Sequence, residues 1–364
     1  MGPEDKRIKL TGPWKVRARV GPLSRYLSLD TPKLLEALSS RDMTTRFNAW
    51  RAVPILLKEG KLKVEDVKPL KGHFFEVLKS RTDLYVSLSW QTAVELAELG
   101  VITREDSRTL LEILLFPRAD VRKEAWLSVP KLVELGIITP EEIRERRYCL
   151  FPLLARDNDP MFSAWGVVDD LLEMKAFSRG DAPLLLRLLK SGNILVRQRA
   201  WARALALTQH GVLTLEELKR VKRYFLEALK YPFLEVEADW GRMVIPLDPW
   251  SVALELLNAG VLEREDLLGR VKYFLEALDY PNPNFRLMAW WDSVELVKLG
   301  LIGVEVLRGK KISFLQIAVS LRERQTALRE WREVAEELVK VGALSREDLE
   351  GSTSPGGEER GGSS

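Results

Sequence analysis

Trp291 and the acids that follow it have the residue types and spacing that could do chemistry. They lie in FRLMAWWDSVELVKLG, residues 285–300, which has the apolar spacing of a helix. Trp290 and Trp291 are about 100° apart on such a helix, so they cannot face the same neighbour. In one interpretation Trp291 reaches a groove, where it could anchor a protein partner or stack on a nucleic-acid base. In the other it is partly buried against the next structural unit.

A stripe of basic residues could bind phosphates. Lysine and arginine recur three residues apart in successive predicted helices, and residues at this spacing share a helix face. Stacked helices would align them into a ridge, and each neutralised phosphate would add a salt-dependent increment of affinity. Alternatively, neighbouring glutamates pair with the cations and the stripe is a solvated surface. The basic stripe consists of Lys68, Lys71, Arg144, Arg147, Lys219, Lys222, Arg308 and Lys311.

The first thirty residues form a basic arm with an aromatic residue inside it. The arm contains Trp14, Arg17 and Arg19, which suit contact with nucleic acid or ribosomal RNA. Equally, the arm could fold back and cover the exposed apolar end of the first structural unit. The sequence supports both interpretations.

An acidic insertion is a further candidate binding segment. Residues 233–249 lengthen one structural unit by about ten residues and carry Trp240 among acidic residues. We expect this segment to leave an otherwise helical body as a loop without strands. In repeat proteins such loops often lie on the binding face.

Composition excludes several kinds of chemistry. The only cysteine, Cys149, cannot form a disulfide framework or a cysteine metal site, and we predict no metal site and no cofactor. No segment approaches the ~18 apolar residues of a membrane span, so we expect no membrane contact and a cytoplasmic location. A net charge of +3 does not favour strong polyanion binding overall. Only six asparagines and five glutamines are present, which is typical of hyperthermophile proteins.

An internal repeat supplies the elements that position these residues. Tryptophan recurs every 36 to 49 residues, and glycine usually follows it ten residues later, with Lys175 as the exception. The intervening residues have helical spacing, and glycine suits the left-handed residue that ends a helix. Capping sequences such as TPEE (139–142) then start a second helix. Such regularity predicts that the tryptophans fill the core between units: Trp50, Trp90, Trp126, Trp165, Trp201, Trp250 and Trp290, with an offset copy at Trp331.

The repeating unit is therefore a pair of helices of about 40 residues, which cannot bury its apolar face alone. RADVRKEAW (118–126) and NPNFRLMAW (282–290) resemble the turns and helix starts of the HEAT-repeat family. The resemblance covers about residues 31–342. It implies an all-α fold, a right-handed α-solenoid of about eight helical hairpins. We expect three regions: a basic arm or cap (1–30), the solenoid (31–350) and a disordered tail rich in glycine and serine (351–364).

A second resemblance provides the one enzyme hypothesis. The segment WDSVE (291–295) is similar to the Trp-Trp-Asp-hydroxyl-Val-Asp segment of alkylpurine DNA glycosylases built from HEAT-like repeats. In that family a carboxylate one helical turn from an aromatic residue stabilises cationic charge as a damaged base leaves. The resemblance implies this role for Glu295, whose side chain is longer than the family's aspartate. Trp165 and Asp169 form another pair with this spacing.

We predict a non-catalytic function, a scaffold that binds a macromolecule. A protein partner is favoured, with Trp291 and Trp240 as anchors. Nucleic acid or a ribonucleoprotein such as the ribosome is the alternative, bound by the basic arm and the basic stripe. A DNA glycosylase comes third, because the similarity of the short segment WDSVE and a HEAT-like fold do not by themselves imply that activity.

Overall fold

The computed structural model describes residues 7–9, 23–80, 83–157, 163–238, 241–321 and 324–353. Trp14, Arg17, Arg19 and Trp240 lie outside these ranges, as does most of the predicted tail, residues 354–364. The chain divides into two compact units. The N-terminal unit contains Thr11–Ser191 and Ala206–Leu213, and the C-terminal unit contains Met1–Leu10, Gly192–Leu205 and Thr214–Ser364.

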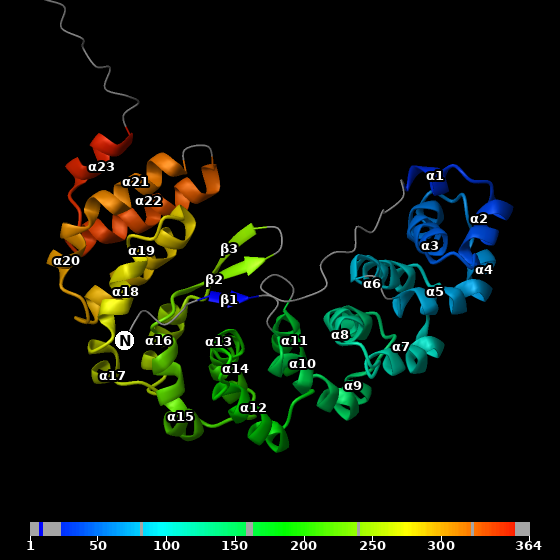
Figure 1. Ribbon diagram of the computed structural model, residues 1–364, viewed down its shortest axis with the longest axis horizontal. Coiled ribbons are helices and arrows are strands. Elements are labelled where there is room, and N and C mark those ends of the chain that lie inside the picture. Colours follow the sequence, from blue (N-terminus) through cyan, green and yellow to red (C-terminus); the bar gives the residue numbers. More distant parts are fainter. Residues whose placement is uncertain are drawn as a thin grey trace, which may run out of the picture. The chain divides into compact units, whose positions relative to one another are not determined.

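The N-terminal unit is built from helical hairpins in which a short or divided helix precedes the helix that carries a repeated tryptophan (Figure 1). Neighbouring tryptophan helices pack on each other, α3 on α6 and α6 on α8. In the next hairpin the short 3-10 helix η4 (Ala164–Val167) carries the tryptophan and contacts α8. The α-helices are α1 (Ser24–Leu27), α2 (Thr31–Leu38), α3 (Met43–Lys58), α4 (Val64–Val67), α5 (Lys71–Leu78), α6 (Asp83–Glu98), α7 (Ser107–Ile113), α8 (Ala119–Glu134), α9 (Pro140–Arg146), α10 (Phe151–Ala155), α11 (Val168–Glu173) and α12 (Ala182–Leu189).

The C-terminal unit continues the same pattern, and α19 contacts both α16 and α22 (Figure 1). The predicted all-α solenoid of helical hairpins is thereby confirmed. The helices are α13 (Ile194–Ala202), α14 (Ala204–Gln209, at the boundary of the units), α15 (Leu215–Ala228), α16 (Pro249–Asn258), α17 (Arg264–Leu268), α18 (Val271–Ala277), α19 (Pro283–Lys298), α20 (Val304–Gly309), α21 (Lys311–Ser320), α22 (Gln325–Lys340) and α23 (Arg346–Thr353). The strands are β1 (Arg7–Lys9), β2 (Phe233–Ala238) and β3 (Gly241–Pro246).

The repeated tryptophans, Trp331 included, are no more than 2% exposed, which confirms their predicted place in the core. Trp290, for example, packs against Phe314 with the ring centroids 5.2 Å apart. Its Nε1 also donates a hydrogen bond of 3.2 Å to the carbonyl oxygen of Leu278. That carbonyl lies just after α18, where helix carbonyls have no partner within the helix. The indole thus fills the core and caps the helix before it.

A left-handed residue ends the tryptophan helices, as the repeat predicts. Gly300 has φ of 65°, and Lys175 adopts the same conformation with φ of 53°. In this conformation the Cβ of an L-residue crowds the following carbonyl oxygen, at a cost of about 1–2 kcal/mol. Lys175 is therefore a strained position that the sequence pattern identifies.

Replacing Lys175 with glycine is expected to raise the free energy of unfolding by about 1 kcal/mol. Glycine removes the Cβ clash, and its greater freedom in the unfolded chain offsets part of the gain. Urea unfolding of Lys175→Gly and Lys175→Ala measures the effect, because alanine also loses the lysine side chain but keeps Cβ. Equal stabilities of the two variants would contradict the explanation.

The insertion forms a β-hairpin, so our expectation of a loop without strands is wrong there. β2 pairs antiparallel with β3, and β1 of the basic arm pairs parallel with β2 (Figure 1). The sequence FLEVEA alternates apolar and acidic residues, which is the period-two pattern of a half-buried strand. Leu234 and Ile245 are buried together with Leu195 of α13, and this small cluster anchors the hairpin on the helices.

Candidate functional site

Trp291 lies beside the buried Trp290 on α19, yet its own side chain is 50% exposed. It lines a hollow of about 300 Å³ formed by residues of α19 and α22, which we call the tryptophan groove. Four glutamates and one lysine line the groove, so its formal charge at neutral pH is −4 + 1 = −3. The lining residues besides Trp291 are Val294, Glu295, Lys298, Glu333, Val334, Glu336 and Glu337.

Ion pairs organise the carboxylates of the tryptophan groove. Lys298 Nζ lies 2.7 Å from a carboxylate oxygen of Glu295 and 3.3 Å from one of Glu337. Hydrogen bonds from Lys340 and Lys298 lower the pKa of Glu337, which favours its ionised form. Arg329 and Lys340, which do not line the groove, also pair with Glu333 and Glu337, at 3.3 and 2.6 Å. With these two cations and Lys298 counted, the four carboxylates leave an excess of one negative charge beside the Trp291 ring (−4 + 3 = −1). Such a combination attracts cations, by charge and by the face of the indole.

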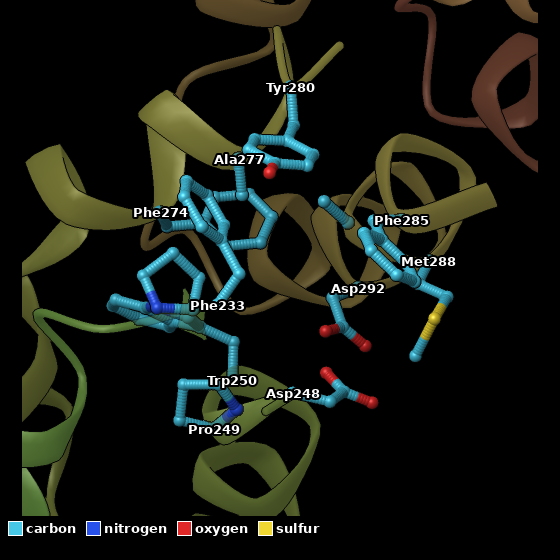
Figure 2. A pocket seen from close by; sticks show the side chains of 12 residues that line it. Phe233, Asp248, Pro249, Trp250, Phe274, Ala277, Tyr280, Phe285, Met288 and Asp292 are labelled. Carbon is cyan, nitrogen blue, oxygen red and sulfur yellow. The ribbon is translucent and has the colours of Figure 1, made fainter. Parts of the chain in front are cut away.

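A second hollow, which we call the aspartate cavity, lies where α19 meets the start of α16 and β2 (Figure 2). Its volume is about 30 Å³, whereas a single water needs about 10–15 Å³ on the same measure. The cavity therefore has room for about two water-sized groups. Two carboxyl groups line it together with apolar side chains that include Phe233, Trp250, Phe274, Tyr280, Phe285 and Met288.

The two carboxyl groups of the aspartate cavity, Asp248 and Asp292, face each other and are hydrogen-bonded (Figure 2). Burial, reinforced by the neighbouring Asp248, raises the pKa of Asp292 to about 8. Burial also raises the pKa of Asp248, while the hydrogen bond from Asp292 lowers it. Two adjacent buried carboxylates do not both ionise readily. At neutral pH Asp292 therefore keeps its proton and donates it to the Asp248 carboxylate.

Asp248 reaches this position through an uncommon backbone conformation. It is the residue before α16 and has φ of 45° and ψ of 49°, a left-handed conformation that aspartate tolerates better than most residues. Its carboxylate also accepts a hydrogen bond of 3.4 Å from the Ser251 backbone N–H, which caps α16. Asp248 therefore has three roles: it is the N-cap of α16, it forms part of the turn after β3, and it pairs with Asp292 of α19.

The structure places the two candidate acids of the glycosylase hypothesis in other surroundings. Glu295 is exposed and is paired with Lys298. Asp169 is exposed on α11, while Trp165 is buried in the core and cannot stack on a base there. Sequence reasoning missed the buried acid of this region, Asp292. The available signal was an aspartate two residues after a repeated tryptophan, where most other units have alanine, valine, serine or threonine.

Half of the basic stripe forms ion pairs that connect neighbouring hairpins. In each pair the cation of one hairpin contacts the aspartate at the start of the next hairpin's first helix. That aspartate also accepts the backbone N–H of the helix-capping residue, at 2.8–2.9 Å. We call these pairs the cap links: Lys71–Asp106 (2.8 Å), Arg147–Asp181 (2.8 Å), Lys222–Asp266 (2.6 Å) and Lys311–Asp348 (2.7 Å).

Because of the cap links and nearby contacts, few cations of the basic stripe are available to bind phosphate. Lys311, with Ser345, lowers the pKa of Asp348 to about 2, so this carboxylate is a strong competitor for the cation. Arg144 and Arg308 donate to the carbonyls of Lys175 and Gly342, which follow the tryptophan helices of their own hairpins, at 3.1 and 2.8 Å. Two members remain: Lys219, which pairs with a glutamate of its own helix at 3.0 Å, and the half-buried Lys68.

A metal site or a membrane span would be a further functional feature in the part of the chain that the structure describes. Within those residues no group of three or more His, Cys, Asp or Glu side chains is arranged to hold a metal ion. None of the helices described is both long and apolar enough to cross a bilayer. Cys149 is a free, partly buried thiol.

No family model matches the sequence, and no curated protein matches it. Among solved structures, the chain is similar to a chain of the full-length AP-3 complex in an intermediate open conformation, a homology model. The TM-score is 0.50, with 17% identity, over 90% of this chain and 54% of that chain. Kap121p gives a TM-score of 0.40 and 12% identity over 87% of this chain and 40% of its own. Kap121p bound to Pho4p gives 0.41 and 13% over 90% and 40%.

The chain thus spans about half the length of the AP-3 chain and two fifths of Kap121p. At 17% identity, the likeness to the AP-3 chain shows a shared fold, the α-solenoid of helical hairpins, and nothing about ligands. Function has to be inferred from the site itself.

Proposed function

We propose that this protein is a non-catalytic scaffold that binds another protein, and that the tryptophan groove holds a basic side chain of that partner. The observation that supports this proposal most strongly is the position of Trp291, which is half exposed on α19 and surrounded by glutamates. Tryptophan is the side chain most enriched at interface hot spots, and its face attracts lysine and arginine. A hollow of about 300 Å³ has room for either cationic group.

Charge favours a protein over a nucleic acid as the partner at this groove. A phosphodiester chain would have to approach Trp291 past four carboxylates, whose charge exceeds that of the three cations paired with them, so the net interaction is repulsive. The basic stripe, which supports the nucleic-acid alternative, is largely engaged in the cap links and carbonyl contacts. Binding by the basic arm and by Trp240 stays a prediction, since those residues lie outside the described ranges.

The same electrostatics count against the glycosylase alternative. DNA must approach such an enzyme closely enough for a base to reach the acid, and bound phosphates need cations nearby. Here Glu295 pairs with Lys298, the one lysine that lines the groove. The aspartate cavity, at about 30 Å³, is too small for a nucleobase. The scaffold assignment therefore fits these residues better.

Capture from a native extract tests the proposed function, with the bait as wild type, Trp291→Ala or Glu330→Gln. Glu330 is exposed on α22 and does not line the groove, so its variant is a matched control. We expect the recovery of partner proteins to be unchanged by nuclease treatment. Of the two variants, only Trp291→Ala should lower that recovery, by at least tenfold. Captured material that disappears with nuclease, or recovery that is equal for Trp291→Ala and wild type, would contradict the proposal.

A further inference from the structure

The face of α19 that carries Trp291 lies between two hollows that both suit cations. Met288 lines the aspartate cavity and is 41% exposed, and Trp291 lines the tryptophan groove and is 50% exposed. Residues three apart share a helix face, so these two side chains form one continuous exposed ridge. A chain that lies across the ridge could reach both hollows. All of these residues belong to the C-terminal unit.

The aspartate cavity suits a lysine side chain in particular. Its volume of about 30 Å³ matches an ammonium group with the methylene next to it, whereas the planar guanidinium of arginine is larger. The Asp248 carboxylate supplies the negative charge. Phe233 and Tyr280, whose ring centroids are 3.9 Å apart, supply aromatic walls of the kind that attract ammonium groups.

The tryptophan groove is less selective. It is about ten times larger, and its carboxylates come from both α19 and α22. Either an ammonium or a guanidinium could lie on the Trp291 ring and contact Glu333 or Glu336. The two hollows therefore prefer different but compatible side chains, lysine in the first and lysine or arginine in the second.

We propose that the exposed face of α19 binds an extended, basic segment of the protein partner that presents two cationic side chains, a lysine in the aspartate cavity and a lysine or arginine in the tryptophan groove. This inference rests on the proposed function and specifies the partner's chemistry. A helix is about 10 Å across and an extended chain advances about 3.3 Å per residue. The two basic residues should therefore be about three or four positions apart.

Fluorescence anisotropy with blocked, labelled peptides tests the spacing. The series is Lys-(Ala)n-Arg with n from 1 to 6, which holds the net charge constant. We expect the tightest binding at n of 2 or 3, about tenfold tighter than at n of 6. The double variant Asp248→Asn/Asp292→Asn, checked for folding by its thermal melt, should abolish this dependence on spacing, because a neutral pair supplies no charge for the lysine ammonium, and Glu330→Gln should preserve it.

Proton release gives an independent readout of the aspartate cavity. Calorimetry of the best peptide at pH 7 in two buffers of different ionisation enthalpy counts the protons exchanged. We expect wild type to release about one proton as the ammonium replaces it between Asp248 and Asp292. The Asp292→Asn variant should release none, and its thermal melt checks that it is folded.

Failure of this inference differs from failure of the proposed function. Equal affinity at all spacings, with binding still lost in Trp291→Ala, would overturn the two-hollow arrangement and leave the scaffold with one anchor. Affinity that is unaffected by Trp291→Ala would overturn the proposed function as well. Spermidine that binds tenfold more tightly than the best peptide would overturn the assignment to a protein segment and indicate a small polyamine instead.

Discussion

Replacing Trp290 with alanine lowers the free energy of unfolding of the C-terminal unit by about 3–5 kcal/mol, the range expected for a buried large aromatic residue. The indole is fully buried, packs against Phe314 with the two rings tilted by 54°, and donates to the Leu278 carbonyl. Alanine leaves a cavity and removes one of the two donors to the Leu278 carbonyl, which keeps its hydrogen bond from Ser313 Oγ, so the loss comes mainly from the cavity. Urea unfolding combined with amide hydrogen exchange in α19 and α21 measures the loss.

The neighbouring residue provides the matched control. Trp291→Ala removes the same number of atoms from the same helix, but from a half-exposed position. We expect this variant to lose less than about 1 kcal/mol, as surface substitutions usually do. Equal destabilisation of the two variants would show that the repeated tryptophans do not form the core of the solenoid.

Replacing Asp292 with asparagine should make the protein more stable above neutral pH and flatten its dependence on pH. The pKa of Asp292 is about 8 in the folded protein against an ordinary value of 3.8, so between these values the folded state binds the extra proton. Wild-type stability is therefore present at low pH and is lost as pH rises through this window. Each pKa unit is worth about 1.4 kcal/mol, so the loss of wild-type stability over the whole window is at most roughly 6 kcal/mol.

Thermal melting curves of wild type and variant at pH 5, 7 and 9 measure the direction and the size of this change in stability. The asparagine amide keeps a donor for Asp248, so we expect similar stability at pH 5 and an advantage of about 2–4 kcal/mol for the variant at pH 9. Glu295→Gln on the exposed face of α19 is the control and should keep the wild-type profile. An Asp292→Asn protein that lost stability with pH as steeply as wild type would rule out the shared proton.

The sequence alone predicted the solenoid because its signals are local and periodic. The left-handed residue and the capping box depend on contacts within one hairpin, and the buried tryptophan depends on packing between adjacent helices that recurs in every unit. Lys175 shows the strength of the pattern, since a lysine adopts the conformation that the repeat reserves for glycine. The cation positions of the basic stripe were also recognised, although the aspartate partners of four of them lie 34 to 44 residues later.

The aspartate cavity could not be predicted in the same way, because it depends on contacts outside the period. Asp248 belongs to the end of the insertion, and Asp292 is one hairpin further along the chain. Their meeting follows from the left-handed turn at Asp248 and from the packing of α16 on α19. The pairing of β1 with β2 joins segments more than 220 residues apart, and no spacing rule links them.

The cap links bear on how such a chain could change in length. Each link joins a cation of one hairpin to the first-helix aspartate of the hairpin after it. The links occur at alternate junctions, so one link is repeated every two hairpins. Duplication or deletion of two consecutive hairpins would re-create the junction with the link charges still matched, whereas a change by one hairpin would leave an aspartate or a cation without its partner. The gene can therefore grow or shrink by pairs of hairpins at little cost to the protein's stability.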